Sequence, residues 1–418
     1  MDRLHIFGPN RLVGGIRASG AKNAALPALA ASLLADEPLI LDSVPAVADI
    51  RTMRRLLEHD GVESREIDGA LELAPTGGPA VDEAPYELVK TMRASVLVLG
   101  PLVARRGHAR VSLPGGCAIG VRPIDQHLAG LEALGATVEL KEGYVEARAD
   151  RLVGGEFRFA SPTVTGTENL MMAATLAAGE TALHNCAREP EVVDLAELLS
   201  KMGAHIEGAG EETIRIAGVD RLGGARHRVI PDRIEAGTYL IAAAISGGDI
   251  RVDHLDPEAL RPLLEKLEET GACVEVEADA VRVRRDGVLL ARDIVTAPHP
   301  GYPTDLQAQY MALMTQAQGP ATVCETVFEN RFQHVPELGR MGAQIVVEGT
   351  YARVAGPTRL SGAHVMATDL RASACLVLAG LVAEGETVVD RIYHLDRGYD
   401  RMELKLQELG ARVERRSG

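Results

Sequence analysis

A cysteine stands among glycines in residues 114–123, which read PGGCAIGVRP. Three glycines in seven residues favour a mobile loop over a helix or a strand. A thiol on such a loop is accessible, and the guanidinium of Arg122, five residues after Cys117, would favour the thiolate. The segment therefore predicts either a reactive cysteine or a surface turn in which cysteine replaces serine, and the loop alone does not decide between them.

Three cations stand where apolar helices are expected to begin: Lys22, Arg93 and Arg371. Threonine, aspartate and asparagine are common at helix starts because they cap free backbone N–H groups, and capping explains Thr167 and Thr368. Capping does not explain the cations, because a positive charge opposes the helix dipole there. A cation beside free N–H groups would instead form an anion site. We expect these helix starts to converge on one cleft between two domains.

Two further arginines, Arg331 and Arg397, lie on loops just before predicted amphipathic helices. Alone, each is more often a solvated loop charge than a ligand.

The elements that must position these residues recur along the chain. A helix ending Leu-x-x-x-Gly-(Ala/Val) appears six times, with gaps of 74, 68, 68, 71 and 68 residues between the glycines. The six glycines are Gly61, Gly135, Gly203, Gly271, Gly342 and Gly410. Even spacing over the whole chain indicates repeated supersecondary units. The glycine is expected at the C-terminal end of each helix, where a left-handed residue is favoured.

Within a unit, an apolar helix rich in small residues precedes a short β-like run, an amphipathic helix and two more strands. Asn169–Ala178 and Thr238–Ser246 are examples of the apolar helix, and Val192–Met202 is an example of the amphipathic one. A helix that is apolar on all sides is buried. The pattern predicts an α/β protein of six βαβαββ-type units, which divide into two sets of three.

Composition narrows the class of protein. The chain has 418 residues, of which 46% are hydrophobic and 3% aromatic, with no Trp and a net charge of −15. This composition disfavours nucleic acid as a partner, and no apolar run is long enough to span a membrane. Five scattered cysteines favour neither disulfides nor a metal cluster and fit a reducing cytoplasm.

Several stretches spread along the chain carry a resemblance to a known family. They are Ser19–Asn23, Met92–Ser95, Pro114–Cys117 with Arg122–Asp125, Pro303–Gln309, Phe328–Phe332, Thr368–Ala372 and Asp396–Tyr399. Taken together and in this order, they closely resemble the enolpyruvyl transferases, and among these the enzymes that act on UDP-N-acetylglucosamine. One departure is Thr163–Thr167, where many members have Ser-Val-Gly-Ala-Thr, so nucleotide contacts there stay open.

The resemblance implies a two-domain inside-out α/β barrel, with buried helices inside and sheets outside, and three repeats in each domain. The first domain is expected at residues 22–229, carrying the Cys117 loop, and the second at residues 1–21 plus 230–418. The active site is expected in the cleft between them.

The resemblance also implies the reaction. The enolpyruvyl group of phosphoenolpyruvate would move to the 3′-hydroxyl of UDP-N-acetylglucosamine through a tetrahedral ketal, releasing phosphate, as the first committed step of peptidoglycan precursor synthesis. No metal or organic cofactor is implied.

Residue roles follow from the same resemblance. The expected catalytic residues are Cys117, which donates a proton to carbon, and Asp305, the base. Phosphoenolpyruvate is expected to contact Lys22, Asn23, Arg122 and Arg397. UDP-N-acetylglucosamine is expected to contact Arg93, Pro123, Ile124, Asp125, Gln126, Asp305 and Val327. Other expected active-site residues are Arg331, Asp369 and Arg371. The antibiotic fosfomycin, which alkylates the matching cysteine in the family, is expected to modify Cys117.

Two alternatives remain at this stage. A 5-enolpyruvylshikimate-3-phosphate synthase shares the architecture and the phosphoenolpyruvate chemistry but lacks a cysteine loop of this kind. A non-catalytic six-repeat scaffold would be expected to have lost Cys117, Lys22, Asp305 or Arg397, and all four are present.

Overall fold

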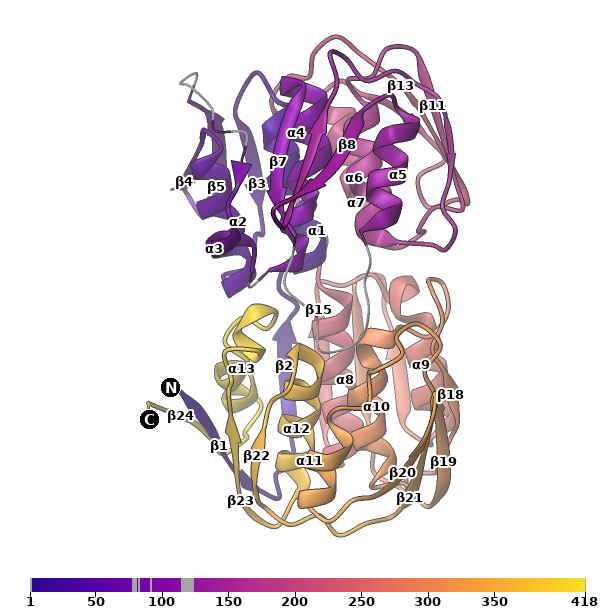
Figure 1. The fold of residues 1–418 in the computed structure, drawn as a ribbon. Coiled ribbons are helices and arrows are strands. Elements are labelled where there is room, and N and C mark those ends of the chain that lie inside the picture. Colours follow the sequence, from indigo (N-terminus) through magenta and orange to yellow (C-terminus); the bar gives the residue numbers. More distant parts are fainter. Residues whose placement is uncertain (1, 77–80, 82, 91, 114–123, 418) are drawn as a thin grey trace. The chain divides into compact units, whose positions relative to one another are not determined.

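A computed structural model describes residues 2–76, 81, 83–90, 92–113 and 124–417. Of these residues, those between 20 and 230 form one compact unit, unit I, and residues 2–19 with 231–417 form a second, unit II (Figure 1). The segment 114–123, with Cys117, Arg122 and Pro123, lies outside the described residues.

The described part of unit I contains three four-stranded sheets, with strand orders β14-β3-β5-β4, β6-β7-β9-β8 and β10-β11-β13-β12. Their strands are β3 (Leu39–Asp42), β4 (Val62–Ile67), β5 (Ala70–Pro75), β6 (Glu83–Ala84), β7 (His108–Ser112), β8 (Thr137–Lys141), β9 (Tyr144–Arg148), β10 (Glu156–Arg158), β11 (Glu180–His184), β12 (His205–Glu207), β13 (Thr213–Ala217) and β14 (Ala225–Arg228).

The described part of unit II contains three more, with orders β22-β23-β1-β24, β16-β17-β15-β2 and β18-β19-β21-β20. Their strands are β1 (Arg3–Gly8), β2 (Val13–Arg17), β15 (Asp249–Asp253), β16 (Cys273–Val276), β17 (Ala280–Arg284), β18 (Ile294–Val295), β19 (Gly319–Cys324), β20 (Gln344–Glu348), β21 (Tyr351–Gly356), β22 (His364–Met366), β23 (Gly385–Asp390) and β24 (Val413–Arg416).

Helices of two kinds separate these strands. The inner helices are α1 (Lys22–Ala31) with η1 (Ser32–Leu34), η2 (Arg93–Val98) with α4 (Leu99–Arg106), α6 (Val164–Ala174), α8 (Arg233–Ser246), η4 (Thr304–Leu306) with α10 (Gln307–Met314), and α12 (Leu370–Val382). The remaining helices are α2 (Ala48–His59), α3 (Tyr86–Val89), α5 (Asp125–Ala133), α7 (Pro190–Lys201), η3 (Pro257–Leu260) with α9 (Arg261–Glu269), α11 (Val335–Arg340), η5 (Leu395–Arg397) and α13 (Met402–Glu408).

Every sheet contains one parallel pair of strands and is otherwise antiparallel. β10 and β11 are parallel and are joined through α6, and β18 and β19 are parallel and are joined through α10. Three sheets take a strand from elsewhere in the chain; in two of them, β14 pairs with β3 in unit I and β2 pairs with β15 in unit II. The sheet of β23 is completed by β1, which lies between β23 and β24. The predicted βαβαββ repeat, three to a unit, is confirmed.

The inner helices are buried on all sides except near their ends. Every residue of α8 from Ile234 to Ile245 is buried, and so is every residue of α12 from Arg371 to Leu381. In unit II, α8, α10 and α12 pack against one another (Figure 1). Small side chains such as alanine allow this close approach, and the prediction of buried helices inside and sheets outside is confirmed.

The repeat glycines end helices in the left-handed conformation, with φ between 84° and 109° at all six positions. In five of the six repeats, the alanine after the glycine donates its N–H to the carbonyl of the repeat leucine; Ala204 N lies 3.0 Å from Leu199 O. This is the bond that closes a Schellman motif. The leucines are fully buried, which stabilises the fold by about 1.5–3 kcal/mol each. The sequence pattern thus encodes both a helix end and a core contact.

The predicted caps at Thr167 and Thr368 are wrong. Thr163 caps α6, accepting a hydrogen bond from Gly166 N at 3.3 Å, and Asp369 caps α12, accepting from Arg371 N at 2.8 Å. Thr167 lies within α6, where its hydroxyl instead accepts from Ala187 N at 3.1 Å. A cap must sit where the backbone turns out of the helix, and neither predicted threonine does.

No described helix is both long enough and apolar enough to cross a membrane.

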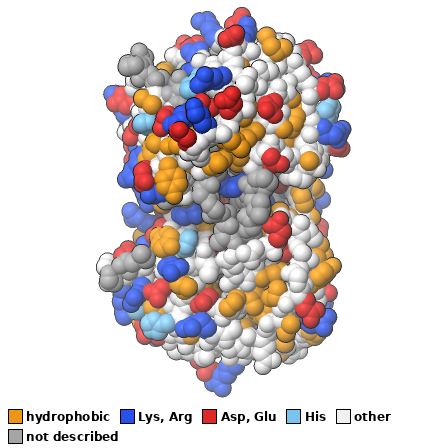
Figure 2. Space-filling model, viewed as in Figure 1, with side chains coloured by type: hydrophobic (Ala, Val, Ile, Leu, Met, Phe, Trp, Pro, Cys, Tyr) orange, Lys and Arg blue, Asp and Glu red, His pale blue; other side chains and the backbone are white. Residues whose placement is uncertain are grey.

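The surface seen in Figure 2 carries acidic and basic side chains in alternation. Exposed ion pairs such as Arg251 with Glu277 and Arg226 with Asp42 reflect this mixture. The net negative charge of the chain therefore does not appear as a single acidic face in this view.

Candidate active site

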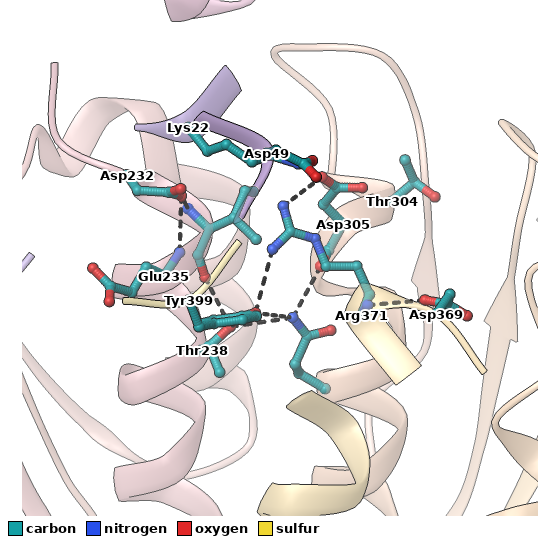
Figure 3. A network of polar contacts seen from close by, with 12 residues as sticks. Lys22, Asp49, Asp232, Glu235, Thr238, Thr304, Asp305, Asp369, Arg371 and Tyr399 are labelled. Atoms are coloured by element: carbon teal, nitrogen blue, oxygen red, sulfur yellow. Dashed lines mark hydrogen bonds and ion pairs between the residues drawn. The ribbon is translucent and has the colours of Figure 1, made fainter. Parts of the chain in front are cut away.

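Asp305 is clamped between two arginines in unit II, and Figure 3 shows it with one of them, Arg371. Its Oδ1 lies 2.6 Å from Nη2 of Arg331, and its Oδ2 lies 2.9 Å from Nη2 of Arg371. The arginine side chains are only 5% and 6% exposed, whereas that of Asp305 is 27% exposed. The carboxylate is therefore the most exposed part of a largely buried cluster.

The clamp keeps Asp305 ionised. Burial favours the neutral acid, but the charges and hydrogen bonds of Arg371 and Arg331 outweigh it and hold the pKa of this carboxyl well below its usual range. A carboxylate held in this way is a weak base but a permanent hydrogen-bond acceptor. It can orient a hydroxyl group and take its proton once that hydroxyl becomes acidic during bond formation.

A buried network of hydrogen bonds holds Arg371 in place. Its Nη1 lies 3.4 Å from the hydroxyl of Tyr399, which lies 2.9 Å from Thr238 Oγ1. Gln309 Nε2 donates to the Tyr399 hydroxyl at 3.2 Å and to the backbone carbonyl of Asp305 at 3.0 Å. The inner helices α8, α10 and α12 thus fix the guanidinium and the Asp305 backbone together (Figure 3).

The remaining predicted residues of unit II lie close to these elements in the chain. Asp369 is the cap of α12, immediately before the helix that carries Arg371. Val327 follows β19, and its backbone N–H donates to Glu325 Oε1 at 2.8 Å. Arg397 is half-buried at the end of η5, whose Asp396 is held by Arg415 at 2.6 Å.

Unit I contains a second charged pair, at the start of α1. Lys22 is the first residue of this helix, and its Nζ lies 3.1 Å from Asp49 Oδ2. Asn23 is half-buried beside it in the chain, and no described side chain caps the helix. A lysine at an uncapped helix start is suited to an anionic ligand.

Arg93 opens η2 and lies near the buried imidazole of His127. Burial, with the charge of Arg93, lowers the pKa of His127 to about 4, so that this ring is neutral. Nδ1 of His127 lies 3.0 Å from the amide of Asn169, whose Oδ1 accepts from Gly100 N at 2.8 Å. The polar network joins η2–α4, α5 and α6.

The predicted nucleotide ligands Ile124, Asp125 and Gln126 form the start of α5. Gln126 already has backbone partners: its Oε1 accepts from Ala160 N at 2.7 Å, and its Nε2 donates to Ser161 O at 3.3 Å. This side chain therefore ties α5 to the segment that leads into α6.

The structure brings some of the predicted residues into direct contact with one another and gives others different partners. Asp305, Arg331 and Arg371 meet in unit II, whereas Lys22 is in contact with Asp49, which the sequence did not single out. The sequence did not single out Glu325 either. Tyr399 and Gln309 lie in stretches that carry the family resemblance, and this was the available signal for them.

The described cysteines differ sharply in exposure. Cys186, Cys324 and Cys375 are buried, and Cys273 is exposed. Burial raises the pKa of Cys186 to about 11 and raises that of Cys375 as well. The two thiols with raised pKa values are therefore poor nucleophiles.

Comparison with known proteins identifies the class. The family model of EPSP synthase (3-phosphoshikimate 1-carboxyvinyltransferase) matches residues 6–406. The enolpyruvyl transferase NikO from Streptomyces tendae superposes with a TM-score of 0.91 at 28% identity, covering 100% of this chain and 99% of its own. EPSP synthase from Acinetobacter baumannii has the same fold, with a TM-score of 0.76 at 17% identity and full coverage of both chains. The fold is that of the enolpyruvyl transferases.

Curated relatives narrow this class. A UDP-N-acetylglucosamine 1-carboxyvinyltransferase from Koribacter versatilis is 58% identical over 418 residues, covering 99% of this chain and 96% of its own. The protein of the same name from Myxococcus xanthus is 58% identical over 417 residues, covering 99% of both chains. The chain belongs to the family of UDP-N-acetylglucosamine 1-carboxyvinyltransferases.

Proposed function

We propose that the protein transfers the enolpyruvyl group of phosphoenolpyruvate to the 3′-hydroxyl of UDP-N-acetylglucosamine, with release of phosphate. The observation that carries the proposal is the clamp of Asp305 between Arg331 and Arg371, in a chain whose relatives match it from end to end. The product would enter peptidoglycan precursor synthesis in the cytoplasm.

The addition step requires an acid and a base. The 3′-oxygen of the sugar bonds to C2 of phosphoenolpyruvate while Cys117 donates a proton to C3. Asp305, held ionised by its arginines, orients the hydroxyl and accepts its proton. The product of this step is a tetrahedral ketal that still carries the phosphate.

In the elimination step, a proton leaves C3 for the thiolate of Cys117 and the bond between C2 and the phosphate oxygen breaks. Inorganic phosphate departs with the proton that Asp305 had accepted. Lys22, Asn23, Arg122 and Arg397 are proposed to hold the carboxylate and the phosphate, because arginine and lysine suit these anions. Arg371 and Arg331 stabilise the ionised Asp305.

The sugar nucleotide is proposed to contact Arg93, Pro123, Ile124, Asp125, Gln126 and Val327, with Asp305 at its reacting hydroxyl. The residues of both units would thus act on the same pair of substrates. The family resemblance supports this assignment, together with the position of Ile124–Gln126 at the start of α5.

One assay tests the function directly. Purified protein with phosphoenolpyruvate is expected to release phosphate when UDP-N-acetylglucosamine is present and not when shikimate 3-phosphate replaces it. Release with shikimate 3-phosphate but not with UDP-N-acetylglucosamine would instead assign the chain to the 5-enolpyruvylshikimate-3-phosphate synthase reaction. Asp305→Ala, assayed alongside, is expected to lose the activity, because the hydroxyl loses its acceptor.

A further inference from the structure

Glu325 is a buried carboxylate directly after β19, and it accepts four hydrogen bonds. Its Oε1 lies 3.0 Å from Thr296 Oγ1, 2.8 Å from Val327 N and 3.1 Å from Phe328 N. Its Oε2 lies 2.8 Å from Thr304 Oγ1. The residue is 1% exposed. A buried carboxylate whose two oxygens both accept hydrogen bonds is fixed in position.

The contacts of Glu325 lead to Asp305 through two side chains. Thr304 Oγ1, which donates to Glu325, accepts from Nη1 of Arg331 at 2.9 Å. The other terminal nitrogen of the same guanidinium, Nη2, donates to Asp305 Oδ1 at 2.6 Å. Each link has one direction, because a carboxylate only accepts, a guanidinium only donates, and the threonine hydroxyl does both.

The same carboxylate holds a second functional segment. Its bonds to the N–H groups of Val327 and Phe328 close the turn after β19, and Arg331 follows four residues after Val327. Glu325 therefore lies at the junction of the two segments that carry Asp305 and Val327. Thr304 precedes Asp305 directly in η4, so any shift of this contact would move the reacting carboxylate.

We propose that Glu325 is a positioning residue, which sets the distance between the Asp305 segment and the Val327 turn and orients Arg331 toward Asp305. This inference rests on the proposed function. It adds Glu325 to the residues on which the activity depends. Hydrogen bonds link Glu325 to Asp305 through Thr304 and Arg331, and they also link it to the Val327 turn.

Glu325→Gln tests the role with a change of one atom and one charge. An amide presents an N–H₂ group either to Thr304 or to the backbone N–H groups of the turn, and each of these is already a donor. Displacement of the reacting groups by about 1 Å typically lowers the rate about 10²-fold. We expect kcat to fall by about that factor and KM for UDP-N-acetylglucosamine to rise. The matched control Glu384→Gln, at an exposed glutamate paired with Arg359, should behave as wild type.

A purely structural role gives a different result. Loss of folded protein would lower kcat in proportion to the active fraction and leave KM unchanged, and that outcome would overturn the inference. If Glu325→Gln does not fold, Thr304→Val provides the test, because it removes only the hydroxyl of the relay. Thr304→Ser restores the hydroxyl and should recover most of the activity.

A double-mutant cycle completes the test. If Glu325 acts through Thr304, the variant carrying both Glu325→Gln and Thr304→Val should be little less active than the less active of the two single variants. Fully multiplicative losses would overturn the relay. Wild-type protein without phosphate release would instead disprove the proposed function, so the two failures are distinguishable.

Discussion

Lys22 and Asp49 form an ion pair in unit I, and both side chains are largely buried. The two charged atoms are 3.1 Å apart, and the side chains are 12% and 6% exposed. Asp49 lies in the first turn of α2, and Lys22 opens α1. The pair joins an inner helix to an outer one and fixes the cation that we propose as a phosphoenolpyruvate ligand.

Asp49→Ala is expected to destabilise the protein, because it leaves the lysine charge enclosed without this partner. Breaking a buried pair costs about 3–5 kcal/mol, and urea unfolding measures the change. Glu66→Ala, which removes an exposed partner of Arg54, is the control and should change stability little. The double variant Lys22→Met with Asp49→Leu should be more stable than Asp49→Ala. Unfolding of Asp49→Ala at the wild-type urea concentration would contradict this expectation.

The stability provided by Asp305 should depend on pH. Its folded-state pKa is held well below 3.8, so its stabilising effect is complete above that value and is lost as the pH falls through the lower folded-state pKa. Asp305→Asn is therefore expected to lower the free energy of unfolding by about 2 kcal/mol or more at pH 7. The difference from wild type should shrink when both proteins are unfolded at a pH below 3.8. A difference that stays the same at both pH values would show that the charge of Asp305 is not responsible.

Cys117→Ala is expected to abolish phosphate release and leave the unfolding curve unchanged, because the proposed proton donor is lost. Fosfomycin should add its mass once to the wild-type protein and not to this variant, as intact-protein mass spectrometry can show. Cys273→Ser is the matched control, since Cys273 is the exposed cysteine among the described residues. Modification at Cys273 with Cys117 untouched would place the reactive thiol elsewhere.

Gly20→Ala should destabilise the protein, because a Cβ atom there would lie 1.7 Å from the backbone oxygen of Ser43. Backbone cannot move aside as a flexible side chain can, so we expect a loss of about 1–3 kcal/mol or more. Gly287→Ala is the control, because a Cβ atom there meets nothing within 4 Å. Thermal unfolding compares the two, and equal melting temperatures would mean that the Gly20 segment can shift.

Local patterns in the sequence predicted the repeating elements well, for a physical reason. A leucine that packs inward and a glycine that ends the helix act within one turn of each other, so their spacing is visible in the chain. The same holds for the apolar helices, whose burial on all sides follows from the absence of a polar face.

The contacts of the candidate site were less predictable. Asp305 meets Arg371 across 66 residues, and Lys22 meets Asp49 across 27, with no periodic pattern to link them. Resemblance to a family indicated Asp305, Arg331 and Arg371 but not Asp49 or Glu325. The predicted caps failed at Thr167 and Thr368 because a small displacement along the chain decides which side chain faces the free N–H groups.

The position of β1 has a consequence for the synthesis of the chain. This strand lies between β23 and β24, and His5 contacts Glu386 across 381 residues. β1 therefore acquires its neighbours only after β23 and β24 have been synthesised, whereas unit I has all its described strands once Arg228 has emerged. We expect unit I to fold during translation and unit II to finish only after it. Both edges of β1 stay unpaired until then, and an unpaired strand edge is prone to pair with other chains.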